Sequence, residues 1–193
     1  MLNNLKNYDI ILASGSPRRK ELLAGLGLKF NVKVLNGIDE SYPPTIPATE
    51  VAQFISKKKS AAYAQLITPE NLIITADTVV VCDNNVLGKP KNKKEAKSML
   101  NALSGKTHQV ITGVTILSVN KSVSFSVNTD VRFAKLSESE ISYYIEKYHP
   151  FDKAGAYGIQ EWIGFIGVEF ISGSYYNVMG LPVQRLYTEL KKW

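Results

Sequence analysis

The segment Ala13-Ser-Gly-Ser-Pro-Arg-Arg19 is the part of the sequence best suited to bind an anion. It follows a short apolar run, Ser16 is a favoured N-cap residue, and Pro17 suits the first position of a helix. The N–H groups at a helix N-terminus lack intrahelical partners, so a strand, a small-residue turn and a helix together form a phosphate cradle. Arg18 and Arg19 are unfavourable near the positive end of the helix dipole unless an anion is present. They could bind phosphate bidentately or pair with acidic side chains of the protein.

A carboxylate interrupts the most apolar stretch of the sequence. Asp77 is the single charged residue between residues 72 and 81. A carboxylate buried without a partner costs several kcal/mol, so Asp77 must be paired, bound to a metal or exposed in a cleft. It could serve as a general base or a Mg²⁺ ligand, or as a purely structural hydrogen-bond acceptor. Asp39 and Glu40 could share a divalent ion with Asp77, although Asp-Glu pairs are also common in solvated turns.

Lysines supply most of the net charge of +6. Lys59 and Lys89 could each hold a phosphate as a point charge, or could be ordinary surface residues. Lys59 ends the run Lys57-Lys58-Lys59, whose side chains fan around a helix at about 100° per residue, so at most one or two of them can enter one site. The net charge also allows a nucleic-acid-binding module, but the chain lacks the interleaved arginine and aromatic residues of a stacking surface.

Other motifs do not complete a site. Ser104-Gly-Lys-Thr107 ends like a Walker A loop, but Leu100 stands where the first glycine is required, and the segment follows a predicted helix instead of a strand. The two histidines, His108 and His149, have no partner at metal-ligand spacing. Cys82 is the only cysteine, which excludes an intramolecular disulfide and favours the cytosol.

The elements that must position these residues alternate along the chain. With 193 residues, 45% of them hydrophobic and 21% charged, the composition is typical of one globular domain with one or two lobes. No apolar stretch reaches the roughly 18 residues of a membrane helix. Interleaved strands and helices predict an α/β fold with a mixed sheet and flanking helices. We expect strands near residues 8–13, 29–35, 72–81, 86–87, 108–118 and 122–133, helices near residues 16–26, 49–65, 92–103, 137–149 and from 182, and short strands and turns over residues 154–178.

Seven short motifs follow one another along the chain: Ala13-Ser-Gly-Ser-Pro-Arg-Arg-Lys-Glu-Leu-Leu23, Gly37-Ile-Asp-Glu-Ser41, Ala76-Asp-Thr78, Gly88-Lys-Pro90, Leu103-Ser-Gly-Lys-Thr-His108, Thr112-Gly113 and Ala154-Gly-Ala-Tyr-Gly-Ile-Gln160. Their order is typical of the Maf family of nucleotide pyrophosphatases, and the chain resembles that family from about residue 8 to residue 182. The resemblance implies one domain over residues 1–193, with a twisted sheet and two lobes around a cleft, similar to inosine triphosphate pyrophosphatases. It further implies a possible homodimer that uses Mg²⁺ or Mn²⁺ to hydrolyse a nucleoside triphosphate between its α- and β-phosphates. From the sequence pattern we expect a cytoplasmic protein without nucleic-acid or membrane partners.

The resemblance also implies roles for single residues. Asp77 resembles the general base, and it shares the metal with Glu40. The residues that resemble the family's phosphate-binding groups are Ser14, Arg18, Arg19, Lys59 and Lys89. One position departs from the family, which usually has alanine after the helical lysine where this chain has Ser60.

Three positions distinguish subgroups within the family. Arg18, Thr78 and Gln160 are similar to the subgroup that acts on dTTP and UTP. A glutamine amide can both donate to and accept from a pyrimidine edge, which agrees with that preference. The alternative is the same chemistry on 7-methyl-GTP or other purine nucleotides, and the remote alternative is the nucleic-acid-binding module.

Overall fold

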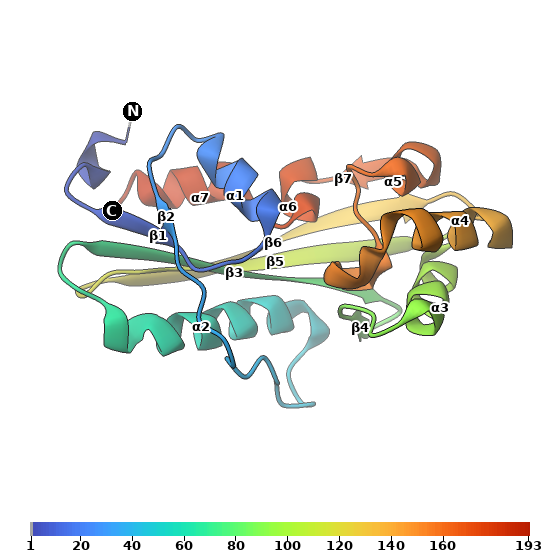
Figure 1. Cartoon of the computed structure of the whole chain (residues 1–193), viewed down its shortest axis with the longest axis horizontal. Helices are drawn as coiled ribbons and strands as arrows, with labels where there is room; N and C mark the ends of the chain where they lie inside the picture. Colours follow the sequence, from blue (N-terminus) through green and yellow to red (C-terminus); the bar gives the residue numbers. More distant parts are fainter. Residues whose placement is uncertain (1) are drawn as a thin grey trace. The chain divides into compact units, whose positions relative to one another are not determined.

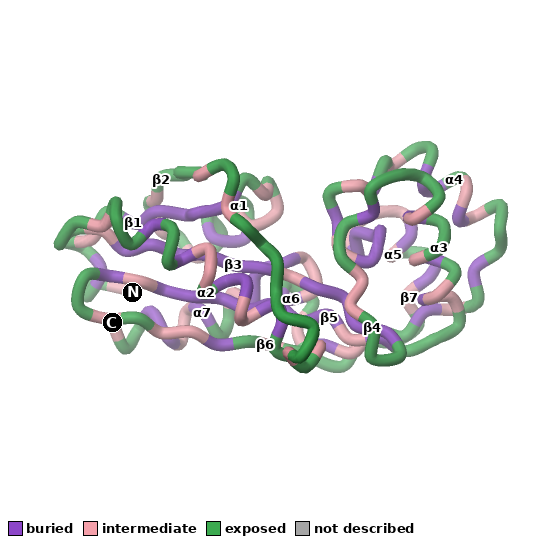
Figure 2. Tube along the Cα trace, turned by 90° about the horizontal axis from the view of Figure 1, so that it is seen from below, coloured by how far each residue is buried: buried purple, intermediate pink, exposed green. Residues whose placement is uncertain are grey.

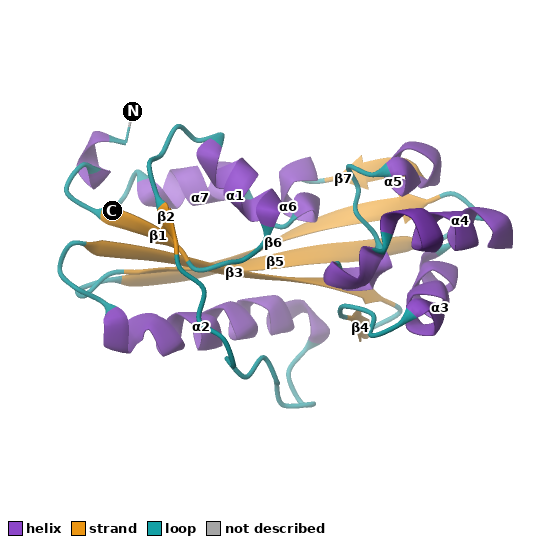
Figure 3. Ribbon diagram, in the orientation of Figure 1, coloured by secondary structure: helices purple, strands orange, loops and turns teal. Residues whose placement is uncertain are grey.

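The computed structural model describes residues 2–193 and has an α/β fold (Figure 3). The strands are β1 (Asp9–Leu12), β2 (Asn31–Val32), β3 (Asn71–Cys82), β4 (Asn85–Leu87), β5 (Thr107–Leu117), β6 (Ser122–Phe133) and β7 (Val168–Ser172). The α-helices are α1 (Pro17–Ala24), α2 (Val51–Tyr63), α3 (Lys93–Leu103), α4 (Glu138–Tyr148), α5 (Trp162–Gly167), α6 (Tyr175–Met179) and α7 (Val183–Leu190). The short 3-10 helices are η1 (Asn3–Leu5), η2 (Ala48–Glu50), η3 (Ala64–Leu66), η4 (Pro150–Asp152) and η5 (Ala154–Ala156).

The strands form one mixed sheet, which confirms the predicted class. Its order is β2-β1-β3-β5-β6-β7, and β4 pairs with β3. Strand β1 is parallel to both β2 and β3, whereas the pairs β3–β4 and β6–β7 are antiparallel. Among residues 2–193, no helix is long and apolar enough to cross a membrane.

The turn predicted after β3 closes the expected hairpin. Asp83 and Asn84 both have positive φ, at 49° and 61°, which is the backbone conformation of a type I′ turn. The register then places Val81 opposite Val86. Asn and Asp tolerate the left-handed conformation better than other non-glycine residues, so this local sequence specifies the turn.

Two predicted segments differ from the structure. Strand β2 has two residues instead of the seven expected, and Val32 on it is exposed. Strand β2 lies at the edge of the sheet and pairs only with β1, so hydrogen bonds to a neighbouring strand hold it on one side only. The prediction of short strands and turns over residues 154–178 is largely wrong, because this segment holds η5, α5 and α6 and only one strand, β7. Its glycines indicated turns, but they also allow short helices to follow one another closely.

The chain divides into two compact units. The first unit contains the chain up to Asp77 together with Thr112–Val127 and Gly180–Trp193. In this unit α2 covers one face of the sheet, and α1 and α7 cover the other (Figure 1). A buried cluster of Ile11, Ala13, Tyr63 and Ile73 packs between β1, β3 and α2. The Tyr63 hydroxyl donates to the Lys33 carbonyl at 2.7 Å, which fixes the chain where it leaves β2.

The second unit contains Thr78–Ile111 and Asn128–Met179. Helices α3 and α4 pack together over its core, whose fully buried side chains include Leu100, Leu103, Val131, Ile141 and Tyr144. The predicted capping box at the start of α4 is confirmed, with Ser137 and Glu140 each bonding the other's backbone N–H. Strand β3 begins in the first unit and ends in the second, and it is buried along almost all of its length (Figure 2).

Candidate active site

The start of α1 has the geometry that its sequence predicts. Ser16 is the N-cap, its hydroxyl accepts from the Arg19 N–H, and Pro17 occupies the first helical position. The Ser14 hydroxyl accepts from the Ser16 N–H at 3.3 Å and from Arg19 Nη1 at 3.4 Å. The turn between β1 and α1 is therefore closed by its own side chains, and it presents the N-terminus of an eight-residue helix.

Arg19 connects three separate segments of the first unit. Its Nε donates to the Gly180 carbonyl and its Nη1 to the Ala76 carbonyl, both at 2.8 Å. Burial lowers the pKa of the guanidinium, and the nearby Asp77 carboxylate opposes that shift. Arg19 thus uses two N–H groups on backbone carbonyls, one of which immediately precedes Asp77. The local sequence predicted the arginine at the cradle but not these carbonyl partners, which come from distant parts of the chain.

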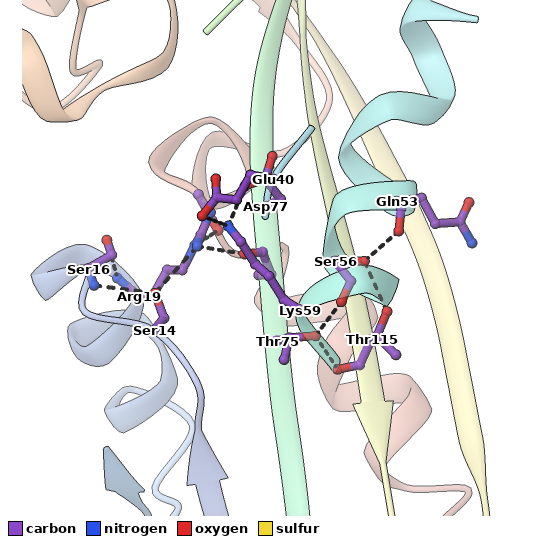
Figure 4. Close-up of polar contacts among 12 residues, drawn as sticks. Ser14, Ser16, Arg19, Glu40, Gln53, Ser56, Lys59, Thr75, Asp77 and Thr115 are labelled. Atoms are coloured by element: carbon purple, nitrogen blue, oxygen red, sulfur yellow. Dashed lines mark hydrogen bonds and ion pairs between the residues drawn. The ribbon is translucent and has the colours of Figure 1, made fainter. Parts of the chain in front are cut away.

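The position of Asp77 follows from the two-residue period of β3. Side chains alternate along a strand, so Ile73, Thr75 and Asp77 share one face, and α2 covers that face. The Thr75 hydroxyl donates to the Ser56 carbonyl of α2 at 2.8 Å, and the Ser56 hydroxyl lies 2.9 Å from that of Thr115. These buried hydrogen bonds fix α2 against β3 and β5 (Figure 4).

Lys59 extends along this face from α2 and ends between two carboxylates (Figure 4). Its Nζ lies 2.7 Å from Oδ1 of Asp77 and 3.0 Å from Oε1 of Glu40. The side chains of Lys59 and Asp77 are only 13% and 12% exposed, whereas that of Glu40 is 49% exposed. The partner required for a buried Asp77 is therefore a lysine, and Glu40 completes the cluster from a loop.

The loop that carries Glu40 is held by the preceding lysine of the same run. Lys58 Nζ donates to Oδ2 of Asp39 at 2.7 Å and to the Ser41 carbonyl at 2.8 Å. The Lys58 hydrogen bond, together with those that the Ser41 N–H and hydroxyl donate to Asp39, lowers the pKa of Asp39 far below its usual range. Gly37, with φ of +75°, supplies the left-handed turn that precedes this segment. Asp39 therefore pairs with Lys58, which the sequence reasoning did not single out, although the lysine run was the signal that could have found it.

The two carboxylates that meet at Lys59 suit a hard divalent cation. Carboxylate oxygens are preferred ligands of Mg²⁺, which is usually bound by one or two carboxylates together with substrate phosphates and water. Lys59 Nζ already marks a point where Glu40 and Asp77 both stabilise positive charge. Among the residues that the structure describes, no group of three or more acidic, histidine or cysteine side chains could hold a metal. The pair fits a metal whose remaining ligands come from the substrate.

Three further candidates, Thr78, Lys89 and Gln160, belong to the second unit. Thr78 follows Asp77 on β3, so its side chain leaves the opposite face of the strand. Lys89 follows β4, and the carbonyl of the preceding Gly88 accepts from the Gly155 N–H at 3.0 Å. The Oε1 atom of Gln160 is buried and has no hydrogen-bond partner within residues 2–193.

A network that the sequence reasoning missed supports the segment before Gln160. The Tyr144 hydroxyl accepts from the Gly158 N–H and donates to Oε2 of Glu161, and Lys153 Nζ lies 3.0 Å from Oε1 of Glu161. Burial, together with the Glu161 hydrogen bond, strongly raises the pKa of Tyr144. A Cβ at Gly158 would lie 3.0 Å from both Glu161 and Lys153. The glycine is therefore required for close packing of this network.

His108 is the other buried titratable group of the second unit. Its Nε2 lies 2.7 Å from the Tyr157 hydroxyl, and its Nδ1 has no hydrogen-bond partner among the described residues. Burial lowers the pKa of His108 to about 4. A neutral imidazole packed against Phe133 and Tyr157 is a core residue.

Known proteins resemble this chain along its whole length. Residues 9–193 match the family described as Maf-like protein. A dTTP/UTP pyrophosphatase of Phocaeicola vulgatus is 64% identical over 192 residues, covering 100% of both chains. A dTTP/UTP pyrophosphatase of Parabacteroides distasonis is 58% identical over 191 residues, covering 99% of each. A solved HAM1 protein from Coxiella burnetii shares 13% identity at a TM-score of 0.49, covering 96% of this chain and 100% of that one.

The order of the motifs, the closed turn before α1 and the full-length match agree with one another. The match to the family extends across the turn before α1, the lysine-bridged carboxylates and the segment that ends in Gln160. The chain belongs to the family of Maf-like proteins.

Proposed function

We propose that this protein hydrolyses dTTP and UTP to the nucleoside monophosphate and pyrophosphate. The observation that carries the proposal is Asp77, a buried carboxylate held by Lys59, whose neighbour Ala76 is linked by Arg19 to the turn before α1. Relatives at 64% and 58% identity over essentially the full chain, both named dTTP/UTP pyrophosphatase, support the reaction and the base preference.

The triphosphate is bound mainly by positive charge. Arg18 and the N-terminus of α1 contact the phosphate chain, since a helix N-terminus favours anions and a guanidinium binds phosphate bidentately. Lys59 and Lys89 share the remaining charge. Ser14 and Arg19 belong to the same cradle, and their mutual hydrogen bond keeps the turn in shape. Positioning and charge neutralisation supply most of the catalysis of phosphoryl chemistry.

Asp77 is the general base in this proposal. Oδ1 is the oxygen that Lys59 contacts in the absence of substrate and that a metal would take in its place, so we assign Oδ2 to the water molecule. As the water oxygen forms a bond to the α-phosphorus, its proton passes to Asp77. The bond from the α-phosphorus to the bridging oxygen breaks, and its electron pair leaves with pyrophosphate. The rigid attachment of β3 to α2 through Thr75 and Ser56 keeps the base in one position.

Glu40 and Asp77 are the residues that would hold Mg²⁺ or Mn²⁺. When bound, the ion would neutralise charge that develops on the phosphate oxygens. The protein supplies two of its ligands, and the substrate and water supply the others.

Arg18, Thr78 and Gln160 are the positions to which we assign base preference. The buried Oε1 of Gln160 can accept a hydrogen bond from a base N–H, and its amide group can donate. Because a buried acceptor without a partner is unfavourable, a base that satisfies it would be favoured over one that does not.

The cytoplasm is the compartment that we propose, since free nucleoside triphosphates are the substrates. The homodimer expected from the family stays a prediction. So does the absence of nucleic-acid partners.

The proposal is tested by pyrophosphate release from a panel of ordinary and methylated nucleoside triphosphates in Mg²⁺ or Mn²⁺. The wild-type chain should prefer dTTP and UTP. Asp77→Asn should lower kcat by about 10²–10⁴-fold, the usual contribution of a general base. Asp83→Asn is the matched control, because Asp83 is an exposed turn residue that forms a surface ion pair with Lys106. It should turn over like the wild type.

Each contrary outcome contradicts a different part of the proposal. Preference for 7-methyl-GTP or another purine nucleotide would refute the base preference and keep the reaction. A near-wild-type kcat in Asp77→Asn would refute the general base. If the chain hydrolysed none of the nucleotides, the proposed pyrophosphatase activity would be refuted. Tight, salt-dependent binding of DNA or RNA would then favour the nucleic-acid-binding module.

A further inference from the structure

The Lys59 ammonium occupies the point where the proposed metal ligands meet. It lies 2.7 Å from the Asp77 carboxylate and 3.0 Å from the Glu40 carboxylate, with little solvent access to its side chain (Figure 4). A divalent ion that bridged the same two oxygens would lie within a few ångströms of this ammonium, where the two cations repel each other. The conformation in which Lys59 pairs with both carboxylates therefore opposes metal binding.

We infer that Lys59 is the internal counter-ion of the metal site and that a triphosphate must draw it away before a metal binds tightly. This inference rests on the proposed function. Phosphate oxygens offer the ammonium a stronger concentration of negative charge than the two carboxylates do. Once Lys59 contacts phosphate, Glu40 and Asp77 become available as ligands. Metal and nucleotide then bind with positive coupling, each raising the affinity for the other by the same factor.

The exchange requires movement of one flexible side chain and not of the backbone. Lysine carries its charge on a four-carbon stem with several rotatable bonds. Helix α2 is fixed by the Ser56–Thr115 and Thr75–Ser56 hydrogen bonds, neither of which involves Lys59. A metal ion can thus replace the Lys59 ammonium between the two carboxylates while the backbone of α2 stays in place.

Glu40 also has an anchor that does not depend on Lys59. Lys58 holds the neighbouring Asp39 side chain at 2.7 Å and the Ser41 carbonyl at 2.8 Å. When Lys59 leaves, the segment on both sides of Glu40 is still attached to α2. The two adjacent lysines therefore have different functions: Lys58 holds the loop through its ion pair with Asp39, and Lys59 is the cation that a metal replaces.

Mn²⁺ binding to the full-length chain without nucleotide tests the inference, with free Mn²⁺ measured by electron paramagnetic resonance. Lys59→Met should bind Mn²⁺ on the order of 10-fold more tightly than the wild type, the size of a typical coupling. Lys57→Met is the control for the loss of one positive charge on the same helix, since Lys57 is exposed and, within residues 2–193, no hydrogen bond or ion pair joins it to the carboxylates. It should bind Mn²⁺ like the wild type.

A non-hydrolysable dTTP analogue supplies the second arm of the test. It should tighten Mn²⁺ binding to the wild type on the order of 10-fold and change Lys59→Met much less, because that variant has no lysine to remove. Adding Glu40→Gln to Lys59→Met should return Mn²⁺ affinity to the wild-type value, which would locate the ion at the carboxylate pair. Lys59→Gln should behave like Lys59→Met if the latter does not fold.

The inference would be overturned if folded Lys59→Met or Lys59→Gln bound Mn²⁺ no more tightly than the wild type. Equal enhancement by the analogue in wild type and variant would also overturn it. Failure of the proposed function is a separate result, because it would appear as wild-type protein that releases no pyrophosphate whatever the Mn²⁺ affinity of the variants.

Discussion

Replacing Arg19 by lysine separates a positioning role for this residue from simple charge. The Arg19 guanidinium donates from Nε to the Gly180 carbonyl and from Nη1 to the Ala76 carbonyl, each at 2.8 Å. Both carbonyls belong to buried residues. A lysine side chain is shorter and has one nitrogen, so it can donate to one of the two carbonyls but not to both. The substitution keeps the positive charge and leaves one buried acceptor without its partner.

The expected loss follows from one charge-assisted hydrogen bond. Such a bond contributes about 1.5–3 kcal/mol, and an unsatisfied buried carbonyl costs about 1–3 kcal/mol. The lost hydrogen bond and the unsatisfied carbonyl are one and the same change, so the two values are not added. Arg19→Lys should therefore lower the free energy of unfolding by about 1.5–3 kcal/mol. Because Ala76 immediately precedes Asp77, the same change should lower kcat more than it raises KM.

Urea unfolding followed by circular dichroism measures the stability change, and pyrophosphate release measures kcat and KM. Arg132→Lys is the matched control, because Arg132 forms an exposed ion pair with Glu169 in which both side chains are about half exposed. An exposed pair contributes about 0–1 kcal/mol, so the control should stay near wild-type stability. If Arg19→Lys is as stable as Arg132→Lys and only KM rises, Arg19 is a phosphate contact alone and the positioning role is refuted.

Two further predictions concern stability. Gly113→Ala should destabilise the protein by about 1–3 kcal/mol or more, because the new Cβ would lie 2.4 Å from the Ala52 backbone. Gly88→Ala is the control, since a Cβ there meets open space, and it should be tolerated in the same urea titration. Equal stability of the two variants would contradict the close approach of α2 to β5. His108 has a pKa of about 4 in the folded chain against 6.5 in its ordinary state, so the unfolded chain binds the proton first and stability should fall by about 3 kcal/mol as pH drops from 6.5 to 4. His108→Gln should flatten this part of the pH profile, and an unchanged slope would refute a neutral buried imidazole.

Local signals in the sequence were enough for most of the elements. Ser16 and Pro17 start α1 because capping and a fixed φ act within one helical turn. Asp83 and Asn84 close the hairpin through their own backbone preference. Segments whose structure depends on distant neighbours were predicted poorly, as residues 154–178 show: their glycines have no periodic pattern, and packing decides between turn and helix.

The chemical groups of the site were also visible in the sequence. Asp77 required a partner because a lone carboxylate within an apolar strand is unfavourable. The charged residues of the site, the cap before α1 and the class of fold could therefore all be inferred without the structure.

Which charged side chains pair with one another depends on how the helices and strands pack. Lys57, Lys58 and Lys59 are identical by local criteria, yet Lys58 pairs with Asp39 while Lys59 bridges Glu40 and Asp77. Arg19 binds carbonyls at positions 76 and 180, far from it in sequence. Long charged side chains reach in many directions with little local preference, so their partners are selected by the packing of α1, α2 and β3, and not by the residues next to them.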